Sequence, residues 1–441
     1  MYRLIGRPSF MLCALLLINQ PSASASTLRS HPLSLAAAEQ YAVTNNPTAA
    51  SIRAQSQAYK AEGEYQAQLP NPQMQLGVAN LPVDSFDFNQ ENMSQFKVGL
   101  SQQIPGGNSR AIRQNISDFK AQSLQFSATD NELKRLKTVR QSWLELHYLQ
   151  KSQQLILEHQ KIVQQLLTVV KSSYQVGKSN QHDLLMAELQ LNKLDSDVLS
   201  INEKVAIERS KLSRWIGSYA WQPLSDKLPD WRHYAQQNQS FSLPQTAIHP
   251  SLLLHPQVIQ QNKQLQASRL GVNLAKEAYK PNWGVNLGYG YRDDTPAGED
   301  RADFFSASIT VEIPWFNSKR QDKKISQNLY QQKALQNNRL DTIQKLQAEL
   351  TALVMRNEQL EKKHQLYKNI INKKASEQTQ AALSSYQNGK SDFSSVVLAS
   401  AESIDAKRQL HRIIIDQLKT IAAIYYLLPQ SSALNHKDFQ P

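Results

Sequence analysis

Two kinds of hydrophobic pattern run along the 441-residue chain. Over long stretches, apolar residues recur every three or four positions, which is the spacing of an amphipathic helix in a coiled coil. The clearest such stripe comprises Leu133, Leu136, Val139, Trp143, Leu146 and Leu149. Four short stretches instead alternate apolar and polar residues with the period of two that is typical of strands. The patterns predict a mainly α-helical protein with a small β part.

The positions of the prolines indicate how long the helices are. None occurs between Pro105 and Pro223, or between Pro314 and Pro429. Because a proline in a helix interior costs about 3 kcal/mol, each gap predicts a very long helix. We expect long helices over 108–174 and 317–386, followed by turns at Gly177 and Gly389 and by return helices over 180–217 and 392–428. The first would be about 100 Å long.

The two halves of the chain repeat each other. Residues 104–110 match 313–319 at four of seven positions, and 174–179 match 386–391 at five of six. Pro70-Asn71 likewise matches Pro281-Asn282. The chain therefore reads as a tandem duplication of one unit, in which a helix and two strands precede the long helix and its return helix. The first repeat covers 26–217 with strands at about 73–80 and 95–104, and the second covers 251–429 with strands at about 283–292 and 304–313. Residues 218–250 form the connector, and residues 430–441 form a C-terminal tail.

The alternating strands indicate a membrane. Each is about 9–11 residues long, which suffices to cross a bilayer when tilted, and each has one apolar face. We expect the following residues to face lipid: Leu76, Val78, Phe96, Val98, Leu100, Trp283, Val285, Leu287, Tyr289, Phe305, Ile309 and Val311. A soluble antiparallel sheet packed on one face would give the same alternation. Four strands cannot close a barrel, and lipid tolerates no open strand edge, so several copies would have to share one barrel.

Residues 1–25 have the features of a cleavable signal peptide. Arg3 and Arg7 precede a short apolar run over 10–18, and Ala23-Ser24-Ala25 forms a small-residue cleavage site. The only cysteine, Cys13, lies inside this segment. The sequence therefore predicts export from the cytoplasm and a processed chain without disulfides, cysteine nucleophiles or a lipid-modified cysteine.

Composition and charge exclude several other functions. The net charge is +12 and the mean hydropathy is −0.52, which alone would suggest a soluble helical protein. Basic residues are spread along the helices among acidic ones, so we expect no nucleic-acid partner. Histidines are scattered, His159 is expected in solvent, and no sequence motif of a hydrolase or nucleotide-binding site is present. We expect no enzyme activity, no cofactor and no bound metal.

The duplicated unit and the repeated Tyr-x-x-Gly-Lys turns resemble the TolC family of outer-membrane efflux factors over residues 34–429. The stretch 70–82, followed by 98–102, is similar to the branch that works with heavy-metal exporters. The resemblance implies a homotrimer with a 12-stranded β-barrel in outer-membrane lipid and a 12-helix periplasmic tunnel. It also implies docking to a periplasmic adaptor and to an inner-membrane pump of the RND class. Family members often carry an acid nine positions after the turn tyrosine; Asp183 matches, but Ser395 occupies that place in the second copy.

The expected function is a passive exit duct in the Gram-negative outer membrane, for metal ions or small toxic compounds. A conduit for type I protein secretion and a periplasmic coiled-coil scaffold or adaptor remain as alternatives. If three copies assemble, each inward residue at the helical turns becomes a ring of three, and such rings gate channels. The candidates are Tyr174, Gly177, Lys178, Asp183, Tyr386, Gly389, Lys390 and Asp392. The alternative is that these charges only solvate the turn ends.

Overall fold

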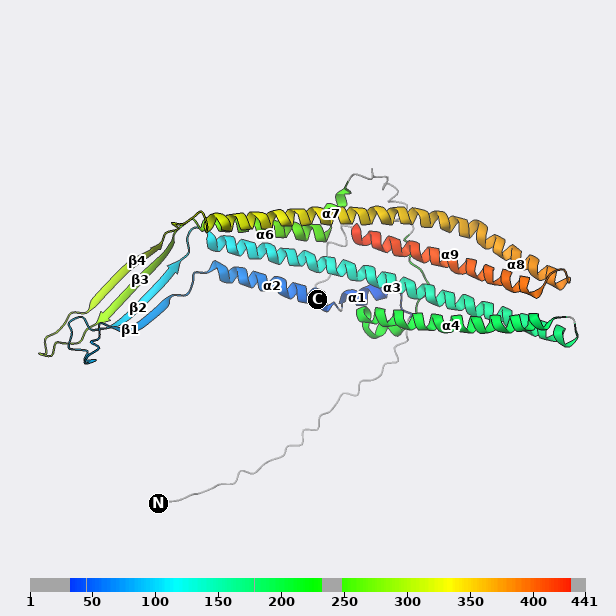
Figure 1. Cartoon of the computed structure of the whole chain (residues 1–441), viewed down its shortest axis with the longest axis horizontal. Coiled ribbons are helices and arrows are strands. Elements are labelled where there is room, and N and C mark those ends of the chain that lie inside the picture. Colours follow the sequence, from blue (N-terminus) through cyan, green and yellow to red (C-terminus); the bar gives the residue numbers. More distant parts are fainter. Residues whose placement is uncertain (1–31, 45, 178, 232–247, 430–441) are drawn as a thin grey trace, which may run out of the picture.

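The protein is a long rod with a sheet at one end and two helical hairpins at the other (Figure 1). The computed structural model describes residues 32–44, 46–177, 179–231 and 248–429. The expected signal peptide, Lys178, residues 232–247 of the connector and the C-terminal tail lie outside the described residues.

A helix, two strands and a helical hairpin occur twice in this order, as the duplication predicts. The first copy comprises α1 (Leu35–Thr44), α2 (Pro47–Ala67), β1 (Gln73–Ala79), β2 (Gln95–Ile104), α3 (Ser109–Gln175) and α4 (Gln181–Ile216). The second comprises α6 (Pro256–Glu277), β3 (Asn282–Tyr291), β4 (Phe304–Glu312), α7 (Gln321–Leu366), the π-turn η4 (Tyr367–Ile371), α8 (Asn372–Gln387) and α9 (Phe393–Leu427). Two short 3₁₀ turns, η1 (Gly217–Trp221) and η3 (Pro250–Leu254), belong to the region between the copies.

The helix that directly precedes the strands begins in the same way in both copies. Pro47 and Pro256 occupy the first turns of α2 and α6, where a missing N–H costs nothing. The residue before each proline caps the helix with its side chain. Asn46 Oδ1 accepts a hydrogen bond from the Ala49 amide at 3.1 Å, and His255 Nδ1 accepts one from the Gln257 amide at 3.2 Å. Both helices therefore begin at positions that the sequence itself defines.

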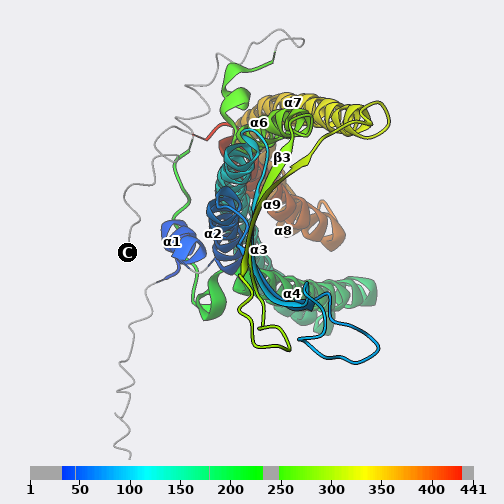
Figure 2. The same ribbon diagram turned by 90° about the vertical axis from the view of Figure 1, so that its left-hand side faces the viewer.

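Helix α3 runs along the whole helical part and packs against α2, α4, α6 and α9. The largest apolar cluster surrounds its middle, where Trp143 is fully buried. The indole Nε1 of Trp143 donates to the carbonyl of Leu33 at 3.0 Å, and Leu33 forms a parallel bridge with Leu224 of the connector. These contacts hold α1 and the connector against the middle of the rod. Viewed along the rod, the helices form an arc with α1 on its outer side (Figure 2).

The four strands form one antiparallel sheet in the order β1-β2-β3-β4. Pairing of β2 with β3 joins the two copies, with Val98 opposite Tyr289 and Leu100 opposite Leu287. Strands β1 and β4 each have one partner, so each presents an unpaired outer edge.

The prediction of one long helix over 317–386 is wrong in two respects. Residues 317–320 form a turn, and the helix begins at Gln321. It is then interrupted by the π-turn η4, although the whole stretch from α7 to α8 equals α3 in length. A π-turn widens the helix locally and changes the direction of the helical segment after it. The rod formed by α7 and α8 curves accordingly (Figure 1).

The predicted apolar stripe on α3 is only partly correct. Val139, Trp143, Leu146 and Leu149 are buried, whereas Leu133 and Leu136 are only partly so. At their level, Glu132 and Arg135 are buried instead, because Glu132 pairs with Arg53 of α2 and Arg135 donates to the carbonyl of Trp215 at 2.6 Å.

His159 also departs from the expectation of a solvated side chain. It is 2% exposed, and its Nε2 lies 3.1 Å from the Ser400 hydroxyl, since α9 covers this face of α3. Within the described ranges, no helix combines the length and apolar character needed to cross a membrane.

Candidate functional site

One face of the sheet is apolar and uncovered. Rows of paired residues cross all four strands, and because side chains directly opposite one another share a face, each row is continuous. One row contains Leu76, Val98, Tyr289 and Phe305, all of them exposed. A soluble sheet would bury such a face, but no element of the described chain covers it.

All twelve residues predicted to face lipid are exposed. The face also includes Met74, Ile104 and Tyr291, which extend the rows to the ends of the strands. Gln102 is a polar exception on this face, opposite Val285. Its amide nitrogen donates to the carbonyl of Pro70 at 2.8 Å, which satisfies part of its polar group within the protein.

The opposite face of the sheet is polar. Gln75, Gly99, Gly288 and Ser306 form one row across it. Next to this row, the Asn286 amide donates to the Thr310 hydroxyl at 3.1 Å. The row consists of small and polar residues, so this face is suited to lining a water-filled interior.

At the far end of the rod, each hairpin reverses at a glycine with positive φ. Gly177 has φ +73° and Gly389 has φ +67°, a left-handed conformation that favours glycine. Each glycine amide donates to the carbonyl of the tyrosine three residues earlier, Tyr174 or Tyr386, at 3.0 Å. The two predicted turns therefore have the same backbone form.

The two turn tyrosines have different surroundings. Tyr174 is 42% exposed, whereas Tyr386 packs edge-on against Phe393, with ring centroids 5.8 Å apart. Phe393 is fully buried and belongs to a cluster with Val170 of α3 and Ala187 of α4. This cluster fastens the tip of the second hairpin to the first.

Two of the charged candidates, Asp183 and Asp392, directly precede Leu184 and Phe393 of this cluster. Asp183 accepts a hydrogen bond from the Ser179 hydroxyl at 3.2 Å. Burial raises the pKa of Tyr386, and the nearby carboxylate of Asp183 raises it further. The structure thus places Asp183 of the first hairpin near Tyr386 of the second. Lys390 and Asp392 are exposed at their turn, and Lys178 lies outside the described residues.

Phe393 was not among the residues that the sequence singled out. The available signal was the spacing of Phe393, Val396 and Val397, which places an apolar face directly after the turn. Sequence periodicity does not reveal that this face meets the other hairpin.

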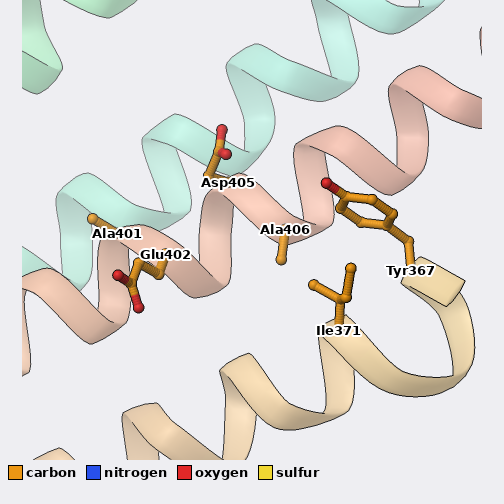
Figure 3. Close-up of a pocket in the computed structure, with 6 residues that line it drawn as sticks. All are labelled: Tyr367, Ile371, Ala401, Glu402, Asp405 and Ala406. Atoms are coloured by element: carbon orange, nitrogen blue, oxygen red, sulfur yellow. The ribbon is translucent and has the colours of Figure 1, made fainter. Parts of the chain in front are cut away.

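A small hollow lies beside the π-turn (Figure 3). Tyr367 extends from the turn alongside α9, and Ile371 points toward Ala406. Ala401, Glu402, Asp405 and Ala406 line the hollow from α9. Among the described residues, no group of three or more His, Cys, Asp or Glu side chains is arranged to hold a metal ion.

Comparisons with known proteins agree with this architecture. A family model described as outer membrane efflux protein matches residues 39–218 and 247–428. Comparison with curated proteins gives no match. The structure of CusC has a TM-score of 0.74 at 17% identity, covering 89% of this chain and 91% of CusC. VceC from Vibrio cholerae has a TM-score of 0.73 at 12% identity, covering 89% and 95%. The CmeC outer membrane channel of Campylobacter jejuni has a TM-score of 0.74 at 12% identity, covering 89% and 85%. These likenesses show a shared fold, and the family match extends over most of both repeats. The chain belongs to the outer membrane efflux protein family.

Proposed function

We propose that three copies of the chain form a channel through the Gram-negative outer membrane. The observation that carries this proposal is the uncovered apolar face of a sheet with two unpaired edges. Lipid cannot satisfy the backbone groups of an open edge, so β4 of one copy pairs with β1 of the next. Three four-stranded sheets give twelve strands, enough for a barrel, since closed barrels begin at about eight.

The channel is the passive exit duct of an efflux system. The polar face of the sheet, with Gln75, Asn286 and Ser306, lines the barrel, and the helices continue it as a 12-helix tunnel into the periplasm. The duct receives its cargo from a periplasmic adaptor and an RND-type inner-membrane pump, and the pump supplies the energy. Export of the chain by a signal peptide over residues 1–25 is consistent with this location.

Metal ions or small toxic compounds are the proposed cargo. Residues 70–82 and 98–102, which resemble the heavy-metal branch, support this assignment. A strain lacking the protein is expected to become more susceptible to such compounds when metals, drugs and dyes are compared. A defect confined to one secreted protein would instead favour a type I secretion conduit.

The hairpin tips form the gate. Threefold symmetry would bring Lys178, Asp183, Lys390 and Asp392 into rings around the tunnel end, with Tyr174 and Tyr386 beside them. The proximity of Asp183 to Tyr386 and the inward course of α8 and α9, which leave the arc of the other helices (Figure 2), support this assignment. Gly177 and Gly389 allow the chain to reverse because glycine adopts the positive φ that each turn requires.

The experiment that tests the function is reconstitution of the full-length protein. We expect it in the outer-membrane fraction, as a trimer by native mass spectrometry, with ion conductance in planar bilayers. Recovery in the soluble periplasm as a protein without conductance would favour a coiled-coil scaffold or adaptor and would refute the channel.

A further inference from the structure

Two large aromatic side chains are uncovered where the sheet meets the helices. Trp315 is 78% exposed and Phe316 is 84% exposed, in the segment between β4 and α7. This segment projects beyond the end of the helical arc (Figure 2). It comes directly after β4, whose outer edge is unpaired. No element in the described part of the chain buries either ring.

The internal duplication provides a template for this position. In the first copy, Gly106 and Gly107 take the places of Trp315 and Phe316. These glycines come after β2 and contact the junction between α6 and β3, the neighbouring strand. A Cβ on Gly106 would clash with the carbonyl oxygen of Pro281, and a Cβ on Gly107 would lie 2.5 Å from Cδ of Lys280. The segment after one strand therefore rests on the segment before the next strand.

Polar groups make this contact within the chain. The Gly106 amide donates to Oδ1 of Asn282 at 2.8 Å, and the Asn108 amide donates to Oε2 of Glu277 at 2.8 Å. Lys280 pairs with Glu277 at 2.8 Å. Close backbone approach and hydrogen bonds hold the two copies of the repeat together, and side chains at the glycine positions would prevent that approach.

The corresponding junction of the first copy, between α2 and β1, is different. Pro70-Asn71 matches Pro281-Asn282, so Leu69 takes the place of Lys280 and Gln66 that of Glu277. Leu69 is 42% exposed and the nearby Tyr65 is 79% exposed. The ion pair is thus absent from the first copy, and the two glycines are replaced by aromatic residues in the second copy.

We infer that Trp315 and Phe316 of one chain pack on Tyr65 and Leu69 of the neighbouring chain in the trimer. This inference rests on the proposed function, because it requires β4 of one copy to pair with β1 of the next. This contact between chains has the same arrangement as the contact of Gly106 and Gly107 within one chain. Apolar side chains take the place of the backbone hydrogen bonds. Burial of apolar surface is the contribution that an association between separate chains requires, since covalent connection does not hold them together.

Aromatic residues at this depth also suit the membrane interface, where tryptophan is enriched. The replacement of Lys280 by Leu69 at the equivalent position favours contact with a neighbouring chain over contact with lipid. Contact of Trp315 and Phe316 with lipid would require no particular residue at the α2–β1 junction. Lipid contact is therefore the competing outcome of the test.

Cysteine cross-linking tests the inference on the full-length protein. In a Cys13→Ala background, Phe316→Cys is combined with Leu69→Cys, because the equivalent pair, Gly107 and Lys280, is in contact within the chain. We expect disulfide-linked dimers and trimers on non-reducing gels, which are lost on reduction. Each single variant is expected to remain monomeric on the gel. The matched control joins Phe316→Cys to Lys280→Cys, which occupies the other junction and is expected to give no cross-link between copies.

Trp315 fluorescence gives an independent measurement. In nanodiscs of brominated phosphatidylcholine, lipid contact would quench the contribution of Trp315, measured as the difference between the parent protein and Trp315→Phe. A trimer that gives no cross-link and shows this quenching overturns the inference and leaves the proposed channel intact. A purified chain that does not form trimers overturns both.

Discussion

Nδ1 of His147 lies 3.3 Å from Nε2 of His411, across the interface between α3 of the first copy and α9 of the second. Nε2 of His147 lies 3.1 Å from the backbone oxygen of Asp226 in the connector. Burial lowers the pKa of both imidazoles, and the neighbouring His147 contributes to lowering the pKa of His411 to about 4. Burial therefore favours the uncharged pair, in which one ring nitrogen donates to the other.

Acid is therefore expected to destabilise the rod. A histidine in the unfolded chain has a pKa of about 6.5, so between that value and about pH 4 the unfolded state binds more protons than the folded state. The free energy of unfolding falls as the pH falls through this window. At pH 5 the loss from His411 is on the order of 2 kcal/mol. Circular-dichroism melting at pH 7.5, 6 and 5 measures the effect.

The variant His411→Gln is expected to flatten this pH dependence, because glutamine does not titrate. His182→Gln, at an exposed position, serves as the matched control and is expected to keep the parent's profile. Equal pH dependence of the parent and His411→Gln would contradict the assignment.

The contact between the hairpin tips is expected to depend on Phe393. The change Phe393→Ala removes a fully buried ring from the cluster with Val170 and Ala187, at a cost of about 3–5 kcal/mol. Loosened tips are expected to raise the single-channel conductance in planar bilayers. Ser395→Ala, at an exposed position two residues further on, is the control. A folded Phe393→Ala trimer with the parent's conductance would count against a gate at this position.

Charge reversal at the tips is expected to open the channel. Asp183→Lys and Lys390→Glu each reverse three charges in a trimer. Asp183→Lys also replaces the carboxylate that lies near Tyr386. Each is expected to raise conductance. Asp197→Lys, further along α4 from the turn, is expected to leave it unchanged. Unchanged conductance in both tip variants would rule out the gating role.

Neighbouring positions on β2 are expected to differ in their tolerance of charge. Leu100 lies on the apolar face opposite Met74 and Leu287, whereas Ser101 lies on the polar face opposite Gln73 and Asn286. Leu100→Arg is expected to cost about 2–4 kcal/mol near the bilayer midplane and to reduce the trimer recovered from the outer membrane. Ser101→Arg is expected to be tolerated. Equal recovery of both would contradict the assignment of the faces.

Sequence patterns predicted the features that depend on local geometry. The strand period of two sends alternate side chains to opposite faces, so the exposed positions of Leu76, Val98 and Phe305 could be predicted from sequence alone. The absence of proline predicted the long helices, and repeated segments predicted the two copies. Gly177 and Gly389 were identified as turns because a left-handed residue ends a helix most easily as glycine.

Which surfaces meet depends on long-range packing that the sequence patterns do not reveal. Helical periodicity identifies a face but not its partner, so the burial of His159 by α9 and the contact of Phe393 with the other hairpin could not be predicted. The same holds for Arg135, a charged residue that is buried because the carbonyl of Trp215 accepts its hydrogen bond. The π-turn at Tyr367 also carries no marker in the sequence, because its widened turn depends on how α7 and α8 pack along α9. In a duplicated chain, the sequence reveals the repeated units, and long-range packing determines which of their faces meet.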